Sequence, residues 1–165
     1  MTTMYASGLE HFTDLDDVLA VGSYPHAPEH VQQLLASGVR AIVNLQSDAD
    51  LKTRGVQWSI LWQLYTRSSI AVARVPVIDF DRADLQRHLS EAVEAIQGFV
   101  SAGRKTYVHC NAGINRSPSA VIAWRVAHRG ESVEAATEWL ADQHSCAPYP
   151  EVLTAWAKRN GLSQR

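Results

Sequence analysis

The chain has 165 residues, enough for about one domain that buries nearly 70% of the surface its unfolded form would expose. Apolar residues make up 46% of the sequence and charged residues 19%, which is typical of a folded globular protein. The net charge of −2 gives no general attraction for nucleic acid or for an anionic membrane, so neither is expected as a partner. Because no apolar run approaches about 18 residues and no signal-peptide pattern opens the chain, we expect a cytoplasmic protein.

Strands and helices are predicted to alternate along the chain as a single domain over residues 1–165, with a core at about 12–160. In chain order, the predicted elements are a short edge strand at 18–21, a helix at 28–37, a strand at 39–45, a strand at 72–78, a long helix at 84–102, a central strand at 105–109, and helices at 117–129, 133–144 and 151–160. A variable region separates the second and third strands. The alternation implies an α/β fold with a largely parallel twisted sheet and helices on both faces. Ligands of such sheets bind at the carboxyl ends of the strands.

The segment from His109 to Pro118 reads HCNAGINRSP and carries the main chemical signal. Cys110 comes at the end of a predicted strand, and Arg116 comes six positions later at the start of a predicted helix. The backbone N–H groups between them can curl into a nest that attracts an anion, and the helix N-terminus adds its partial positive charge. Such surroundings favour a thiolate at Cys110, and the planar guanidinium of Arg116 can bind two oxygens of a phosphate. The segment therefore predicts a nucleophile and a phosphate site within one loop.

Other residues of this loop have predicted roles as well. Gly113 supplies a position where a positive φ carries no steric cost. Ser117 can hydrogen-bond the sulfur and ease its departure, and His109 is expected to orient the loop from behind the sulfur. A buried structural cysteine beside an incidental arginine is the alternative, which the succession of strand, glycine, arginine, serine and helix disfavours. The predicted phosphate-binding residues are Asn111, Ala112, Gly113, Ile114, Asn115 and Arg116.

The loop resembles the Cys-x5-Arg signature of the protein tyrosine phosphatase superfamily, in the form His-Cys-x-x-Gly-x-x-Arg-Ser. The resemblance implies a dual-specificity phosphatase fold and a general acid, an aspartate roughly thirty residues before the cysteine. Asp79 lies 31 positions before Cys110 and Asp81 lies 29 before it, so the spacing favours Asp79. Asp81 and Asp84 are expected to be loop or N-cap residues.

Beyond the signature, the sequence is similar to the glucan phosphatases, namely laforin of animals and the starch-excess enzymes of plants. Residues 111–114 fit the signature of that branch, whereas Asn115 replaces its glycine; asparagine tolerates a left-handed backbone better than most residues. The resemblance implies a phosphorylated polysaccharide as the substrate. Further similar stretches are Val21-Gly22-Ser23 before Pro28-Glu29, residues 45–51, Asp79-Phe80-Asp81 and Ser145-Cys146.

Aromatic residues near the predicted site are candidates for substrate binding. The resemblance implies that aromatic rings line a glucan channel, and Phe80 stands beside the proposed acid. Trp62 and Tyr65 are three residues apart, a helical spacing that is also typical of core packing. Tyr149 lies in a loop where the family contributes another aromatic residue to the rim. The candidate substrate contacts are Phe80, Trp62, Tyr65 and Tyr149.

Cys146 is the second cysteine of the chain. It is either a partner that forms a reversible disulfide with Cys110 or, as we prefer, a small apolar residue packed near the surface. The two cysteines, Cys110 and Cys146, are far apart in sequence, and neither a metal site nor a cofactor is predicted. A nucleophilic thiol needs a reducing compartment to stay free.

Three functions are consistent with these patterns. We favour a cysteine-dependent phosphatase that acts through a phosphocysteine intermediate on a phosphoglucan. A phosphatase of the same fold acting on a phosphoprotein, a lipid or a small molecule is the second function, and the lack of a carbohydrate-binding module in the sequence speaks for it. A non-catalytic module that binds phosphate or glucan is the third.

Overall fold

Five strands form one sheet in the computed structural model, which describes residues 8–162. The strands are β1 (Thr13–Asp14), β2 (Leu19–Gly22), β3 (Val39–Asn44), β4 (Ala71–Arg74) and β5 (Lys105–His109). Their order across the sheet is β1-β2-β5-β3-β4. Only β1 is antiparallel to its neighbour, so the carboxyl ends of the other four strands lie at one edge of the sheet. This confirms the predicted α/β class with a largely parallel sheet.

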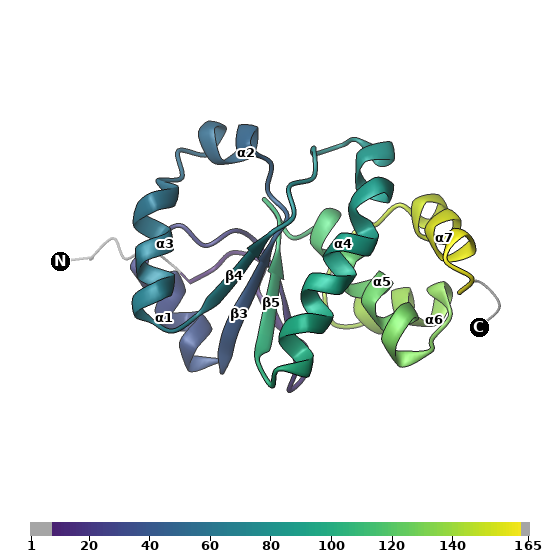
Figure 1. The fold of residues 1–165 in the computed structure, drawn as a ribbon, viewed down its shortest axis with the longest axis horizontal. Coiled ribbons are helices and arrows are strands. Elements are labelled where there is room, and N and C mark those ends of the chain that lie inside the picture. The colour runs from purple at the N-terminus through teal and green to yellow at the C-terminus, as the bar shows by residue number, and fades with distance from the viewer. Residues whose placement is uncertain (1–7, 163–165) are drawn as a thin grey trace.

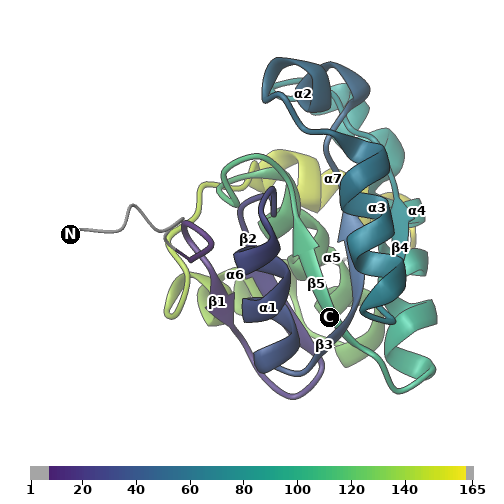
Figure 2. The same cartoon turned by 90° about the vertical axis from the view of Figure 1, so that its left-hand side faces the viewer.

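Helices cover both faces of the sheet. They are α1 (Pro28–Ala36), α2 (Asp48–Thr53), α3 (Trp58–Arg67), α4 (Arg82–Ser101), α5 (Arg116–Arg129), α6 (Val133–Ala141) and α7 (Pro150–Arg159). The sheet stands between α1 and α3 on one side and α4 to α7 on the other (Figure 1). Figure 2 looks onto the side that α1 and α3 cover. No helix in the described part of the chain is long and apolar enough to cross a membrane.

The two helical layers enclose two separate hydrophobic cores. On the α1 and α3 side, Ile42 of β3 packs with Leu34 and Tyr65. On the other side, Val43 packs with residues of α4 and α5, including the fully buried Trp124. Because neighbouring residues of a strand point to opposite faces, β3 supplies both cores and must be apolar on both faces. This explains why Ala41, Ile42 and Val43 in the middle of the strand are all apolar.

The strands differ from the prediction at the edges of the sheet. The segment predicted as an edge strand is β2, which lies inside the sheet because the two-residue strand β1 takes the edge. The strand predicted at 72–78 is shorter, since β4 ends at Arg74. Beyond it, the N–H groups of Val75 and Val77 still donate to carbonyls at the end of β3, which carries the chain toward the carboxyl edge.

The helices differ mainly in the variable region. Residues there fold into α2 and α3, for which no helix was predicted. A capping box starts α2, since the Ser47 side chain accepts from the Asp50 N–H and the Asp50 side chain accepts from the Ser47 N–H. The helix predicted at 133–144 ends at Ala141, so His144 belongs to the loop that follows.

Candidate active site

The loop after the central strand β5 places Cys110 at the carboxyl edge of the sheet. Cys110 is 3% exposed, and its Sγ lies 3.3 Å from Oγ of Ser117 in the first turn of α5. Gly113 adopts φ +74°, and a Cβ at this position would lie 2.5 Å from the backbone of Gly22. Glycine is therefore required here both by the backbone conformation and by the close approach of β2. The result is a tight loop that wraps from the nucleophile to the helix.

Backbone N–H groups of this loop are free to bind an anion. Within residues 8–162, the N–H groups of residues 112–115 donate no hydrogen bond. The first turn of α5 follows directly, and the first N–H groups of a helix have no partner within the helix. Their partial positive charge adds to that of the loop.

The side chain of Arg116 is buried, with 2% of its surface exposed. Its Nη1 donates to the Val77 carbonyl and to Oδ2 of Asp50, both at 2.7 Å, and its Nη2 lies 3.2 Å from Oδ2 of Asp79. The Nε of Arg116 is buried and has no hydrogen-bond partner in the described part of the chain. An unpaired buried donor costs about 1–3 kcal/mol, so an oxygen acceptor at Nε would be favourable. Nε and Nη2 together offer the two donors that a phosphate needs.

Asp50 is a site residue that the sequence analysis missed. Its carboxylate accepts from Arg116, from Nδ2 of Asn111 at 3.0 Å and from the N–H of Ser47 at 2.9 Å. Burial alone would raise the pKa of Asp50, but these three hydrogen bonds outweigh it and lower the pKa, so the carboxylate stays ionised. The Ser-x-x-Asp spacing signals a helix start. It gives no sign of a contact with an arginine 66 positions away.

Two asparagines of the loop use their side chains to secure it. Asn111 is buried, accepts from Nε2 of Gln46 at 2.8 Å and donates to Asp50. Asn115 has φ −124°, so its backbone is not left-handed, and the tolerance of asparagine for that conformation is not needed here. Its Nδ2 instead donates to the carbonyl of Ala147 at 2.8 Å, which ties the loop to the segment after α6. In both cases the side chain is bound to another part of the chain and fixes the position of the loop.

Three aspartates lie near the start of α4, Asp79 and Asp81 before the helix and Asp84 in its first turn, and they have different partners. Asp79 alone of the three contacts the loop arginine. Asp81 is the N-cap of α4, where its side chain accepts from the Asp84 N–H at 2.9 Å. Asp84 is buried and accepts from the Ile78 N–H at 2.8 Å, which closes the segment on itself. The geometry favours Asp79 as the carboxyl closest to the phosphate site.

Two other titratable groups lie near the loop. His109 is buried and its Nδ1–H donates to the Cys110 carbonyl at 3.1 Å. Burial lowers the pKa of His109 to about 4, so the ring is neutral at pH 7 and orients the backbone instead of carrying a proton. Cys146 is a free, half-buried thiol, and burial raises its pKa. A raised pKa disfavours the thiolate that disulfide exchange requires, which favours the packing role.

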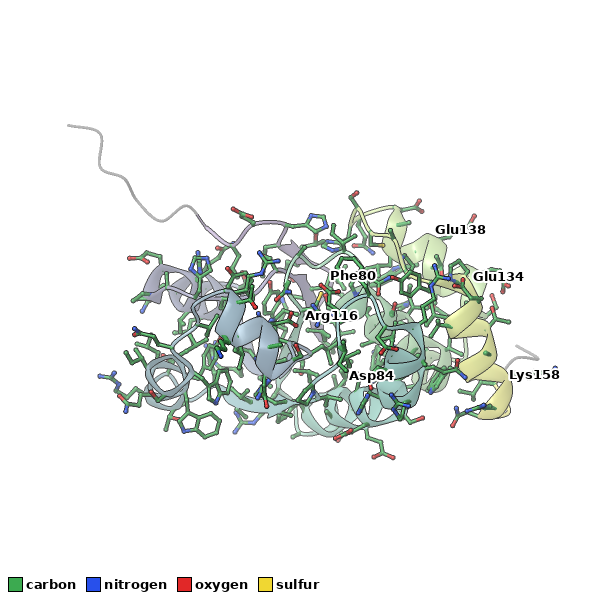
Figure 3. All side chains as sticks on the ribbon, turned by 90° about the horizontal axis from the view of Figure 1, so that it is seen from above. Phe80, Asp84, Arg116, Glu134, Glu138 and Lys158 are labelled. Carbon is green, nitrogen blue, oxygen red and sulfur yellow. The ribbon has the colours of Figure 1, made fainter. Side chains whose placement is uncertain are left out.

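Phe80 follows the candidate acid in sequence, and Tyr149 contacts Arg82 three residues beyond it. Phe80 is 84% exposed and has φ +63°, an unusual backbone conformation for an aromatic residue. Figure 3, seen from the end where α2 lies, shows Phe80 and Arg116 near the middle of the molecule, far from the labelled residues of α6 and α7. The ring of Tyr149 lies 4.3 Å from the guanidinium carbon of Arg82, which follows Asp81.

The other two aromatic candidates are not at the site. Tyr65 is 1% exposed and belongs to the core under α1 and α3, so it is a packing residue. Trp62 is exposed, but it lines a shallow hollow with Ser69, Ala71 and Arg104. These residues lie at the amino ends of β4 and β5, whereas Cys110 lies at the carboxyl end of β5. The structure therefore does not support a substrate contact for either residue.

Comparison with known proteins identifies the family. Residues 19–152 match the family described as "Dual specificity phosphatase, catalytic domain". The chain belongs to this family. Dual-specificity phosphatases are phosphoric monoester hydrolases with a catalytic cysteine, which agrees with the class predicted from the Cys-x5-Arg loop.

Several relatives of this dual-specificity phosphatase are named for different substrates. "Phosphoglucan phosphatase DSP4, amyloplastic" of Castanea sativa is 34% identical over 141 residues, which are 84% of this chain. "Phosphatidylglycerophosphate phosphatase PTPMT1" of Arabidopsis thaliana is 30% identical over 142 residues, or 86% of this chain. Laforin of Mus musculus is 27% identical over 125 residues, or 69% of this chain. The chain spans 38% of the length of each of these relatives.

Solved structures share the fold. PTPMT1 in complex with PI(5)P superposes with a TM-score of 0.75 at 22% identity, covering 91% of this chain and 96% of that one. Human DUSP28 superposes with a TM-score of 0.71 at 26% identity, covering 92% and 95%. The similarity therefore extends over nearly the whole of the described dual-specificity phosphatase domain.

Proposed function

We propose that this protein hydrolyses phosphate monoesters through a phosphocysteine on Cys110, and that its substrate is a phosphoglucan. The observation that carries the proposal is the convergence at one sheet edge of Cys110, the buried Arg116 and Asp79, which lies 3.2 Å from that arginine. A nucleophile, an anion-binding group and a proton donor are the parts that phosphate transfer to a thiol requires.

In the first step, the Cys110 thiolate attacks phosphorus and the bond to the leaving oxygen breaks. Nε and Nη2 of Arg116 and the free N–H groups of residues 112–115 bind the phosphate oxygens. An incoming phosphate competes with Asp79 for Nη2, and the released carboxylate takes up a proton from solvent, which it then donates to the leaving oxygen. Such proton transfer contributes about 10²–10⁴-fold to the rate.

In the second step, water attacks the phosphocysteine and the sulfur–phosphorus bond breaks. Asp79 now accepts the proton of the water, so that phosphate and the thiolate are the products. Ser117, with Oγ 3.3 Å from the sulfur, donates a hydrogen bond that stabilises the departing thiolate. The bound phosphate then leaves. Asp79 either keeps its proton for the next turnover or returns it to solvent and pairs with Arg116 again.

Two observations support a phosphoglucan as the substrate. The exposed ring of Phe80 stands next to Asp79, where it can pack against the apolar face of a sugar. The phosphoglucan phosphatase of Castanea sativa aligns over 84% of the chain at 34% identity. Tyr149, close to the same segment through Arg82, is the second candidate for a sugar contact.

A lipid or phosphoprotein substrate is the second candidate. The side chains of Ile78 and Ile114 are exposed on the two segments that carry Asp79 and Arg116, and with Phe80 they make the rim apolar. An apolar rim suits an acyl or protein surface as well as a sugar. The relatives named as a phosphatidylglycerophosphate phosphatase and as dual specificity protein phosphatases fit this alternative.

The test is phosphate release from solubilised phosphorylated amylopectin, compared with a phosphotyrosine peptide and with phosphatidylglycerophosphate in mixed micelles. Enzyme is dosed to equal activity on an aryl phosphate, and Cys110→Ser serves as the blank. We expect faster release from the glucan than from the other two, and a loss of that preference in Phe80→Ala. Release from the peptide or the lipid alone would reject the phosphoglucan and leave the phosphatase.

A further inference from the structure

The loop after α6 donates hydrogen bonds to the backbone of the phosphate-binding loop, residues 110–116. His144, in the loop after α6, is 2% exposed, and its Nε2–H donates to the Gly113 carbonyl at 2.7 Å. Three residues on, the N–H of Ala147 donates to the Ile114 carbonyl, also at 2.7 Å. Residues 144–147 thus bind two successive carbonyls of the phosphate-binding loop.

The direction of these carbonyls determines the direction of the N–H groups. In a planar trans peptide, the C=O and the N–H point to opposite sides. When a donor outside the loop holds the Gly113 carbonyl, the N–H of Ile114 points to the opposite side, toward the concave face of the loop. The hydrogen bond from Ala147 does the same for the N–H of Asn115. Both N–H groups are among those that donate no hydrogen bond within residues 8–162.

The histidine can donate because a second contact determines its tautomer. The Gly113 carbonyl can only accept, so Nε2 must carry the proton. Nδ1 of the neutral ring is then an acceptor, and Oγ1 of Thr13, 2.7 Å away on β1, donates to it. The ring of His11 stacks on the His144 ring with the centroids 4.0 Å apart, and Nε2 of His11 donates to the Ser145 carbonyl.

We propose that His144 is a positioning residue for phosphate binding, acting through the Gly113 carbonyl to aim the Ile114 N–H at the phosphate. Thr13 supports it by fixing the tautomer, so the antiparallel edge strand β1 contributes to an active site that lies two strands away, after β5. Burial lowers the pKa of His144, which is consistent with a ring that stays neutral at pH 7. The proposal rests on the phosphatase activity and not on the identity of the substrate.

The test uses the inhibition constant of inorganic phosphate, measured against an aryl phosphate substrate, and it compares three variants with the parent protein. His144→Ala removes the donor, and phosphate is expected to bind about ten-fold more weakly with a matching loss in kcat/KM; outright removal of such an anion donor costs about 10²–10³-fold. His144→Gln keeps an N–H at the end of the side chain, and it is expected to recover much of the affinity. Thr13→Val leaves the tautomer free, and it is expected to weaken phosphate binding about three-fold.

The control is His128→Ala, a substitution of an exposed histidine on α5, which is expected to leave the phosphate constant unchanged. Circular dichroism melting checks that each variant is folded. A purely structural role for His144 would lower the melting temperature and leave the phosphate constant of the folded protein as it was, which would overturn the proposal. If His144→Ala does not fold, Thr13→Val decides, and an unchanged phosphate constant in that variant would overturn it. Absence of any aryl phosphatase activity in the parent protein would instead reject the proposed function.

Discussion

Arg116 is bound by two carboxylates of different kinds. Asp50 has a side chain that is 14% exposed, holds Nη1 at 2.7 Å and also binds Asn111 and the Ser47 N–H, so it is tied to its place on α2. Asp79 holds Nη2 at 3.2 Å and its only other acceptor contact in the described chain is with the N–H of the next residue. Asp50 is therefore suited to be a permanent partner of Arg116, and Asp79 to be one that a phosphate can displace. Only Asp79 can therefore leave Arg116 and act in proton transfer.

The permanent role of Asp50 is tested by Asp50→Asn. Removing its charge leaves a buried guanidinium with one carboxylate fewer, and we expect the free energy of unfolding to fall by about 3 kcal/mol. KM for an aryl phosphate should rise, because Arg116 and Asn111 both lose their anchor. Asp48→Asn is the matched control on the same helix, since Asp48 pairs with Arg74 at an exposed site where ion pairs contribute little. Urea unfolding and steady-state kinetics of the pair measure both effects, and equal behaviour of the two variants would contradict this role.

At the scale of elements, the segment from β4 to α4 is organised by its aspartates. Asp81 caps the helix and Asp84 holds the Ile78 N–H, so the two ends of the turn are fixed while Asp79 and Phe80 project from it. A cap and a buried carboxylate make the turn rigid. The rigid turn places the candidate acid next to Arg116.

Asp79→Asn and Asp81→Asn form a pair that separates catalysis from capping. Asp79→Asn should lose about 10²–10⁴-fold on an alkyl phosphate and much less on an activated aryl phosphate, because only a poor leaving group needs the proton. Asp81→Asn should lose little on either substrate, since asparagine is also a good N-cap. Initial rates on the two substrates give the answer. A selective loss on alkyl phosphates in the Asp81 variant would move the acid to that residue.

Local patterns explain which elements could be predicted. Strand β5, the Cys110 loop and α5 are consecutive in sequence, so the motif predicted both the elements and their chemistry. Asp50 was missed because its contact with Arg116 depends on how α2 packs over the loop. Helical spacing indicated one apolar face for Trp62 and Tyr65, but it contains no information on which end of the sheet that face meets. The edge strand β1 was missed because two residues are too few for a pattern.

At the scale of the whole molecule, four buried or partly buried groups couple stability to pH in the same direction. His109 and His144 have lowered pKa values because burial disfavours their charged form. Asp50 and Asp84 also have lowered pKa values, because hydrogen bonds to their carboxylates outweigh the effect of burial. A group whose pKa is lower in the folded state stabilises the fold above its unfolded pKa and loses that contribution as the pH falls through the folded value.

The histidines should therefore lower stability first as the pH falls. For His109 the window runs from about pH 6.5 down to about pH 4, and its full effect is about 3 kcal/mol. Urea unfolding of the parent protein and of His109→Gln between pH 7 and pH 4 isolates this contribution. The variant should lose less stability over the window than the parent. Equal losses would show that His109 does not carry the effect.

The most direct test of the phosphocysteine mechanism is to trap the phosphoryl group on the enzyme. Asp79→Asn mixed with an aryl phosphate should complete the first step and stall at the second, because the base that activates water is missing. Acid quenching followed by peptide mass spectrometry should find the mass of one phosphoryl group on the peptide that contains Cys110, and none in the variant that also carries Cys110→Ser. Phosphate release in a burst without a modified Cys110, or a phosphoryl group on another residue, would contradict the role of Cys110 as the nucleophile.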